Sequence, residues 1–267
     1  MSEKILKIIE EGGDELLHDT AGLLTSIGWA CQISSYYMDV LTGKSREIDI
    51  IARKEFIVKD DFWGGSKTIL IRLFIECKYI KNETLFYFVT KNSEKAKTLA
   101  KDNSILKHDD YVDLRANHYL KGLDVAKTWK GATRDDIYDA LTQSVHSLIY
   151  YEKNYREKTH YIYNLPVVVT KSFDNFFKKE GDDRKFSEIR NNFQLEFDYT
   201  YTLAPKENVS KTFLVDFVSY DKIEAFLKDI ENGDLSILKS KLAQIIFEEG
   251  RMQHSRRDDV DPFSNFR

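Results

Sequence analysis

The chain has 267 residues, of which 42% are hydrophobic and 31% are charged, and its formal net charge is -4 at pH 7. This composition is that of a folded globular protein, and it excludes a chain that is disordered throughout. The negative charge argues mildly against nucleic-acid binding, because phosphate-neutralising proteins usually have a basic face, but such a face can coexist with an acidic total.

Two classes of protein are disfavoured at once. No apolar run approaches the roughly 20 residues of a membrane-spanning helix, and the N-terminal segment is too acidic for a secretory signal, so we expect a cytoplasmic protein with no membrane partner. Cys31 and Cys77 lack metal-binding spacing, which predicts two reduced, buried thiols and neither a disulfide framework nor a zinc site.

The first third of the chain alternates between helical and strand patterns. Residues 3–11 and 14–27 have apolar residues at helical spacing, and Gly28 is placed to end the second helix. Residues 29–38 and 46–53 are rich in β-branched and aromatic residues, which predicts two strands joined by a turn.

A central strand and a longer α/β pattern follow. Residues 68–80 alternate apolar residues on both faces, as a strand covered on both sides should, whereas residues 81–134 are a polar inserted segment without a readable pattern. Beyond it the sequence predicts a helix at 134–151, strands at 165–172, 193–203 and 212–220, and helices at 221–231 and 234–249.

This order predicts one α/β domain over residues 1–250, with a mixed β-sheet flanked by helices, and a flexible C-terminal tail at 251–267. No Gly-rich phosphate loop follows any strand, which argues against a dinucleotide enzyme or a P-loop ATPase.

Three residues carry the strongest chemical signal. Glu76 and Lys78 share a face at the end of the central strand, while Cys77 points away. Asp49 interrupts the apolar run of the preceding strand, and antiparallel pairing would bring it beside Glu76. Two carboxylates and a backbone carbonyl, most plausibly that of Cys77, form the oxygen-rich site that Mg²⁺ or Mn²⁺ prefers.

A purely structural alternative exists for each residue. Glu76 and Lys78 can be an ion pair at a strand end, and Asp49 can be a solvated residue of an edge strand. The catalytic interpretation is favoured because an apolar strand carrying Asp, a turn, and an apolar strand ending in Glu-x-Lys occur together and in this order.

Four segments resemble a known superfamily. The chain has Glu15 in a predicted helix, LLTSIGW at the end of that helix, EIDIIA in a strand and IECKYI in the next strand. In this order they resemble the PD-(D/E)XK, restriction-endonuclease-like nucleases, and more narrowly their Mrr-like branch, over roughly residues 12–80 and the helix at 134–151. The chain departs from the pattern because no Pro precedes Asp49, the spacing from Asp49 to Glu76 is long, and the inserted segment has no counterpart.

The resemblance implies a restriction-endonuclease-like fold and assigns roles to residues. Asp49 and Glu76 would ligate the metal, Lys78 would be the catalytic lysine, Glu15 would be an accessory carboxylate, and Gln143 matches a glutamine that related families carry on the following helix. Glu15 is the weakest of these assignments, because an acidic residue on a helix is more often a solvated surface charge, whereas Gln143 can equally be a polar residue on a helix flank.

The implied activity is that of a Mg²⁺-dependent DNA endonuclease in restriction or anti-phage defence. It would act as a homodimer or as a subunit of a larger defence complex. The alternative is a catalytically silent nuclease-fold subunit that binds nucleic acid or a protein partner. The choice between DNA and RNA stays open at this point.

Other polar residues have weaker claims. His18 and His146 could contact phosphate but are more simply solvated or satisfied histidines, and Asp216 lacks a Glu-x-Lys partner and is placed outside the site. A basic, aromatic DNA-contacting face and a solvated helix face are equally good interpretations of one further set, which comprises Lys91, Lys95, Lys97, Lys101, Phe86 and Tyr87.

Overall fold

The computed structural model describes residues 14–39, 42–59, 62, 65–102, 104–106, 112–131, 134–155, 160–180, 185–204 and 207–258. The predicted helix at 3–11 and the last part of the predicted tail lie outside these residues.

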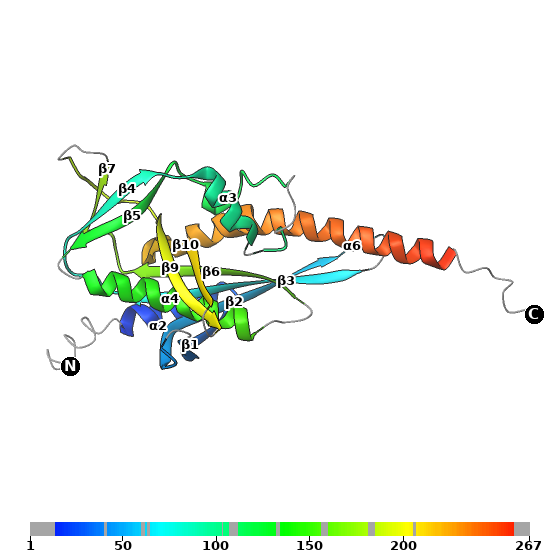
Figure 1. Ribbon diagram of the computed structural model, residues 1–267, viewed down its shortest axis with the longest axis horizontal. Coiled ribbons are helices and arrows are strands. Elements are labelled where there is room, and N and C mark those ends of the chain that lie inside the picture. Colours follow the sequence, from blue (N-terminus) through cyan, green and yellow to red (C-terminus); the bar gives the residue numbers. More distant parts are fainter. Residues whose placement is uncertain are drawn as a thin grey trace, which may run out of the picture.

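Runs of strands separated by helices make up the described chain, which ends in a run of helices (Figure 1). The longer helices are α2 (Asp14–Ser26), α3 (Ser93–Asp102), α4 (Arg134–Asn154), α5 (Ile223–Asp229) and α6 (Leu235–Asp258). Short helical turns are η1 (His118–Leu120), η2 (Tyr220–Lys222) and the π-helical η3 (Ile230–Asp234). The strands are β1 (Ala30–Met38), β2 (Ser45–Lys59), β3 (Ser66–Lys78), β4 (Thr84–Thr90), β5 (Asp124–Gly131), β6 (His160–Thr170), β7 (Phe176–Glu180), β8 (Ser187–Glu188), β9 (Phe193–Ala204) and β10 (Glu207–Ser219).

All of these strands belong to one mixed sheet of ten strands, in the order β1-β2-β3-β6-β10-β9-β5-β4-β7-β8. β1, β2 and β3 form an antiparallel meander, and β6 runs parallel to β3 and to β10. The long connection from β3 to β6 contains α4, which packs on both strands. The predicted α/β class with a mixed sheet flanked by helices is therefore confirmed.

The inserted segment at 81–134 extends this sheet. It forms β4, α3, η1 and β5, and β4 and β5 pair with each other, with β7 and with β9. Strands that find their partners so far along the chain leave no local hairpin signal, which explains why the segment resisted interpretation.

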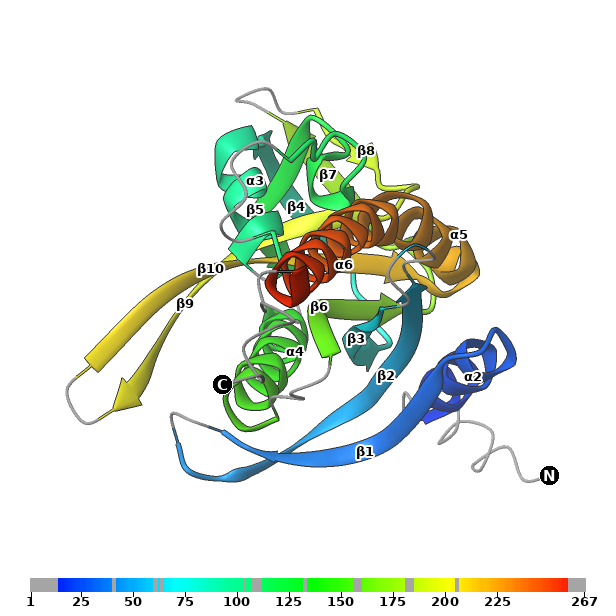
Figure 2. The same ribbon diagram turned by 90° about the vertical axis from the view of Figure 1, so that its right-hand side faces the viewer.

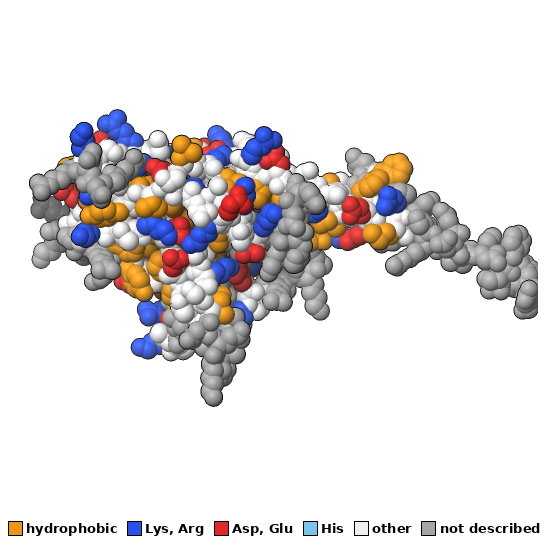
Figure 3. All heavy atoms as spheres, turned by 45° about the horizontal axis from the view of Figure 1, so that its top comes forward, with side chains coloured by type: hydrophobic (Ala, Val, Ile, Leu, Met, Phe, Trp, Pro, Cys, Tyr) orange, Lys and Arg blue, Asp and Glu red, His pale blue; other side chains and the backbone are white. Residues whose placement is uncertain are grey.

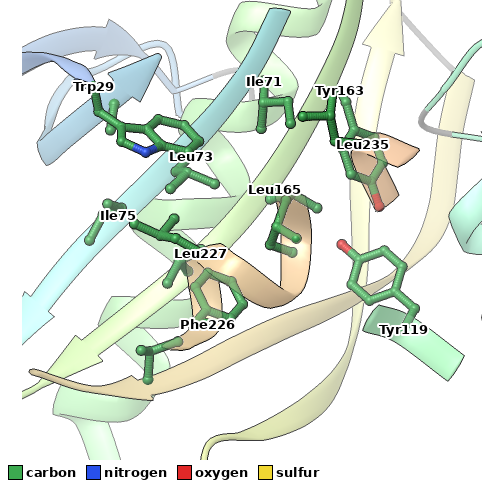
Figure 4. Close-up of a cluster of buried hydrophobic side chains, with 14 of the residues drawn as sticks. Trp29, Ile71, Leu73, Ile75, Tyr119, Tyr163, Leu165, Phe226, Leu227 and Leu235 are labelled. Atoms are coloured by element: carbon green, nitrogen blue, oxygen red, sulfur yellow. The ribbon is translucent and has the colours of Figure 1, made fainter. Parts of the chain in front are cut away.

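The sheet separates two hydrophobic cores. One, the α2/α6 core, contains Leu24 of α2, Leu238 of α6 and Ile75 of β3, and Figure 4 shows part of it around Trp29 and Leu165. The other, the α4 core, lies on the opposite face and is represented by Phe74, Ile137, Leu141, Val145 and Val168. The alternation of Phe74 and Ile75 between the cores agrees with the predicted central strand.

The end of α2 fixes the start of the sheet. Gly28 has φ of 86°, a conformation that only glycine adopts without strain, and the Trp29 N–H donates to the Leu24 carbonyl at 3.0 Å. This C-cap sends Trp29 into the α2/α6 core and begins β1 one residue later. Cys31 on β1 is half-buried and Cys77 is buried, and both are free thiols, so the prediction of a buried thiol was wrong for Cys31.

The C-terminal helices form a nearly unbroken run in which η3 joins α5 to α6. α6 continues to Asp258, so the helix occupies the start of the segment that was predicted to be a tail. It extends away from the body of the molecule (Figure 1). No helix in the described residues is long and apolar enough to cross a membrane.

Candidate active site

Asp49 and Glu76 lie side by side at the same end of two paired strands. The β2–β3 ladder includes Ile50 opposite Ile75, so the next step along both strands brings Asp49 level with Glu76. The Cys77 N–H donates to Asp49 Oδ2 at 2.7 Å, which anchors the carboxylate to β3. Antiparallel pairing thus brings these two residues together as the sequence predicted.

The backbone around Asp49 is distorted. Side chains two residues apart in a strand normally share a face, yet Ile48 belongs to the α4 core and Ile50 to the α2/α6 core. Opposite this point on β1, Ser34 has φ of 51°, in the left-handed region that non-glycine residues rarely adopt. Such strained positions persist where surrounding structure holds them, and they cluster at functional sites.

Glu76 and Lys78 form a close ion pair, with Nζ 2.8 Å from Oε1. The Glu76 side chain is almost completely buried, while about a quarter of Lys78 is exposed. Glu76 Oε2 is buried and makes no hydrogen bond of good geometry among the described residues, although the Asp49 N–H interacts with the carboxyl group and lowers its pKa. A buried carboxylate oxygen without a partner is costly, so it is expected to have a further ligand.

Gln143 on α4 completes this group. With its amide turned so that the nitrogen faces acceptors, that nitrogen lies 2.8 Å from Glu76 Oε1. Glu76 Oε1 then receives hydrogen bonds from both Lys78 and Gln143. The helix that was predicted to supply a glutamine therefore delivers it to the candidate site.

The protonation of the set follows from its burial. Burial and the charge of Asp49 raise the pKa of Glu76 to about 8, against the opposing effect of Lys78. Burial also raises the pKa of Asp49, although the Cys77 N–H and Lys78 partly offset the increase. For Lys78, burial works to lower the pKa, but the charge and hydrogen bond of Glu76 outweigh it and the pKa is raised.

Asp49 and Glu76 are the two carboxylates that could bind a cation at this site. No group of three or more His, Cys, Asp and Glu side chains converges as a ready-made metal site in the described part of the chain. Mg²⁺ is commonly held by one or two carboxylates and completes its octahedral shell with water and substrate oxygens. Asp49 and the unpartnered oxygen of Glu76 fit this mode, with the Cys77 carbonyl as the further oxygen that the sequence suggested.

The structure does not join Glu15 to this group. Its side chain is about half exposed and lies 3.8 Å from Lys171, in a surface ion pair. The neighbouring Asp14 does influence the candidate site, because its charge contributes to the raised pKa of Asp49. His18, on the same helix, is exposed.

One acidic residue near the site was not predicted. The charge of Asp139 contributes to the raised pKa of Lys78. Asp139 precedes Gln143 by four residues on α4, so the two share a helix face, and this spacing was a signal that the sequence did contain.

The suggested DNA-contacting face of lysines and aromatics is not present as proposed. Phe86 is 0% exposed and belongs to the α4 core, Lys95 pairs with Glu196, and Lys97 lies 2.7 Å from Glu94. Charges of both signs are interspersed over the face of the molecule drawn in Figure 3.

Asp216 takes part in a second buried cluster away from the candidate site. His118 lies between two carboxylates, 2.6 Å from Asp234 Oδ1 and 3.2 Å from Asp216 Oδ2. Tyr163 donates to Asp234 at 2.7 Å and Gln194 donates to Asp216 at 3.0 Å. These groups satisfy one another, which is the pattern of a structural network that ties η1 and η3 to the sheet.

Comparison of the chain with protein-family models, with curated proteins and with solved structures finds no match in any of the three. The case for function therefore depends on the geometry of Asp49, Glu76, Lys78 and Gln143.

Proposed function

We propose that this protein is a divalent-metal-dependent nuclease with a restriction-endonuclease-like fold, which hydrolyses phosphodiester bonds of DNA in restriction or anti-phage defence. The observation that carries the proposal is the buried Glu76 carboxylate, which sits beside Asp49, is paired with Lys78, and keeps one oxygen without a partner.

The order of the elements supports the same proposal. Helix α2 ends at the LLTSIGW segment, β2 carries Asp49, and β3 carries Glu76 and Lys78. Helix α4, which precedes β6, the strand that pairs with β3, carries Gln143. The order of these elements agrees with the proposed resemblance, whereas the surface position of Glu15 does not support it.

The protein side of the mechanism follows from the charges. The chemistry that Mg²⁺ supplies when bound is Lewis-acid stabilisation of negative charge on the phosphoryl oxygens. Because the pKa of Glu76 is about 8 without a cation, its carboxyl group must release a proton for Glu76 to act as a ligand near neutral pH.

Lys78 keeps its charge in this arrangement. Since its pKa is raised, it is a poor proton acceptor, and we assign it to orienting the attacking water and balancing charge on the scissile phosphate. Gln143 holds Glu76 Oε1 and thereby fixes the direction of the other oxygen.

The decisive test is cleavage of plasmid and linear DNA with Mg²⁺, with Mn²⁺ or with EDTA. We expect metal-dependent cleavage that Glu76→Gln and Lys78→Ala each reduce by at least ~100-fold, the scale of losing one group that stabilises transition-state charge. Glu94→Gln breaks an exposed Glu–Lys pair and is the matched control that should keep full activity. A wild-type protein that shifts DNA on a gel but never cuts it would instead identify a catalytically silent binding subunit.

A further inference from the structure

A cavity of about 400 Å³ opens beside the candidate catalytic lysine. Its walls come from β1, β2, β3, α4 and β9 and from the turn between β1 and β2, and Lys78 and Gln143 belong both to the cavity and to the candidate site. Figure 2 shows the β1–β2 hairpin on one side of α4 and the β9–β10 hairpin on the other. This volume lies within the ~300–1,000 Å³ range of small-ligand pockets.

Three residues that line this cavity carry polar atoms without partners. Tyr37 Oη, His146 Nε2 and Tyr199 Oη are buried and make no hydrogen bond within the described residues. Their residues are only 2%, 8% and 7% exposed. Each such atom costs roughly 1–3 kcal/mol if it stays unsatisfied, so three around one cavity point to a polar ligand.

The protonation states define what the ligand must offer. Burial lowers the pKa of His146, so its imidazole is neutral near pH 7, and Nδ1 lies 3.5 Å from Asp39 Oδ1. A proton on Nδ1 facing that carboxylate leaves Nε2 as a hydrogen-bond acceptor. Burial raises the pKa of both Tyr37 and Tyr199, so each phenol keeps its proton and can donate or accept.

The cavity also has aromatic and cationic components. The rings of His146 and Tyr199 lie 4.5 Å apart, and the ring of Tyr138 is half exposed on the same cavity. Charges of both signs line the cavity: Arg46 is half exposed and lies 3.6 Å from Asp39, and Lys78 lies near Asp139. Flat rings and mixed hydrogen-bond donors and acceptors suit a planar heterocycle, and Lys78 at the edge of the cavity suits a phosphate attached to it.

We propose that this cavity receives one unpaired nucleobase of the strand whose phosphodiester lies at Lys78. The proposal builds on the proposed nuclease function and names its substrate class: nucleic acid in which a base is free to leave the stack. A matched duplex must spend a few kcal/mol to release a base, whereas a mismatched or single-stranded base costs much less. Single-stranded and mismatched substrates are therefore preferred over matched duplex.

The test separates binding from cleavage. Fluorescence anisotropy in EDTA measures the affinity of the full chain for one DNA oligonucleotide as a single strand, as a matched duplex and as a duplex with one mismatch. We expect the single strand and the mismatch to bind at least ~10-fold more tightly than the matched duplex. Tyr199→Phe and Tyr37→Phe should each reduce this preference by about 3- to 10-fold, the effect of one hydrogen bond.

A matched control lies on the same strand. Tyr201 stacks on Tyr199, with ring centroids 6.2 Å apart, but does not line the cavity, so Tyr201→Phe should leave the preference unchanged. Because Tyr199→Phe removes a buried hydroxyl that has no partner, its thermal unfolding temperature should be equal to or higher than that of the wild type. That measurement excludes misfolding as the cause of any loss.

Each outcome supports or overturns the base-binding cavity, the nuclease function or both. Cleavage of DNA with equal affinity for the three substrates, or with no effect of either tyrosine variant, overturns the base cavity and leaves the nuclease proposal standing. A tyrosine-dependent preference without cleavage under any metal supports the cavity and overturns hydrolysis. If the protein binds none of the oligonucleotides, both proposals fall.

Discussion

The raised pKa of Glu76 makes the metal-free protein lose stability as the pH rises, and Glu76→Gln should remove that loss. The folded-state pKa is about 8, whereas the ordinary value is 4.5, so the folded protein binds this proton more tightly than the unfolded chain does. The resulting stabilisation is fully present below pH 4.5 and is lost as the pH rises through 8. Glutamine mimics the protonated carboxyl and does not titrate.

The magnitude follows from the size of the shift. Each unit of pKa difference corresponds to about 1.4 kcal/mol, so the free energy of unfolding of the wild type should fall by about 4 kcal/mol relative to Glu76→Gln between pH 5 and pH 9. Taking the difference between the two proteins cancels titrating groups far from position 76, so the slope that remains reports Glu76 together with Asp49 and Lys78, which interact with it.

Urea denaturation followed by circular dichroism in EDTA measures this difference at each pH. In a second series, Mg²⁺ should restore stability to the wild type at pH 8 and above but much less to the variant, because a ligand that binds only the folded state stabilises it. A stability difference that stays constant from pH 5 to pH 9 would refute the reasoning that burial beside Asp49 holds a proton on Glu76.

Two further predictions concern the buried cluster and the π-helix. Burial alone would lower the pKa of His118, but Asp234 and Asp216 raise it to about 10, so its stabilising charge should be fully present below about pH 6.5 and lost as the pH rises through 10. His118→Asn should therefore cost about 3–5 kcal/mol in urea denaturation at pH 6, with the cost shrinking above pH 9, and a cost independent of pH would contradict this. Gly233→Ala places a Cβ 2.2 Å from a backbone oxygen and should lower stability by roughly 1–3 kcal/mol. Gly22→Ala in α2 places a Cβ that meets nothing within 4 Å and should raise stability by ~0.5–1 kcal/mol. Equal melting temperatures for the two variants would overturn this comparison.

Strand periodicity accounts for what the sequence revealed about the site. An alternating apolar strand predicts that Glu76 and Lys78 share a face, and a neighbouring antiparallel strand predicts that Asp49 lies close by. Both inferences depend on local backbone geometry, which a single sequence contains. Gln143 required only that α4, the helix that precedes β6, pack back on β3, as it does.

Helix phase explains the uncertain assignment of Glu15. Adjacent residues on a helix differ in direction by about 100°, so the choice between Asp14 and Glu15 depends on how α2 is rotated against the sheet. That rotation is set by the packing of Leu16, Leu17 and Leu24 into the α2/α6 core, which local pattern does not specify closely enough.

Long-range pairing explains why the buried His118 cluster and the cavity beside Lys78 could not be predicted from the sequence. The buried cluster joins three elements that meet only in the folded protein, and they carry His118, Asp216 and Asp234. No spacing along the sequence predicts this contact. The cavity beside Lys78 likewise needs β1, α4 and β9, and β9 reaches it only because β6, β10 and β9 follow β3 across the sheet.

Because both carboxylates are attached to β3, we expect the candidate site to be more rigid around Asp49 and Glu76 than around the cavity wall on β1. Asp49 is held by the Cys77 amide and Glu76 belongs to β3 itself, a strand with paired neighbours on both sides that is buried along most of its length. Amides of such a strand exchange with solvent only when the whole domain opens, whereas an edge strand such as β1 opens locally at much lower free energy. We therefore expect the Tyr37 wall of the cavity to open at a lower free energy than the strand that carries Glu76, which would let the proposed base enter without moving the proposed metal ligands.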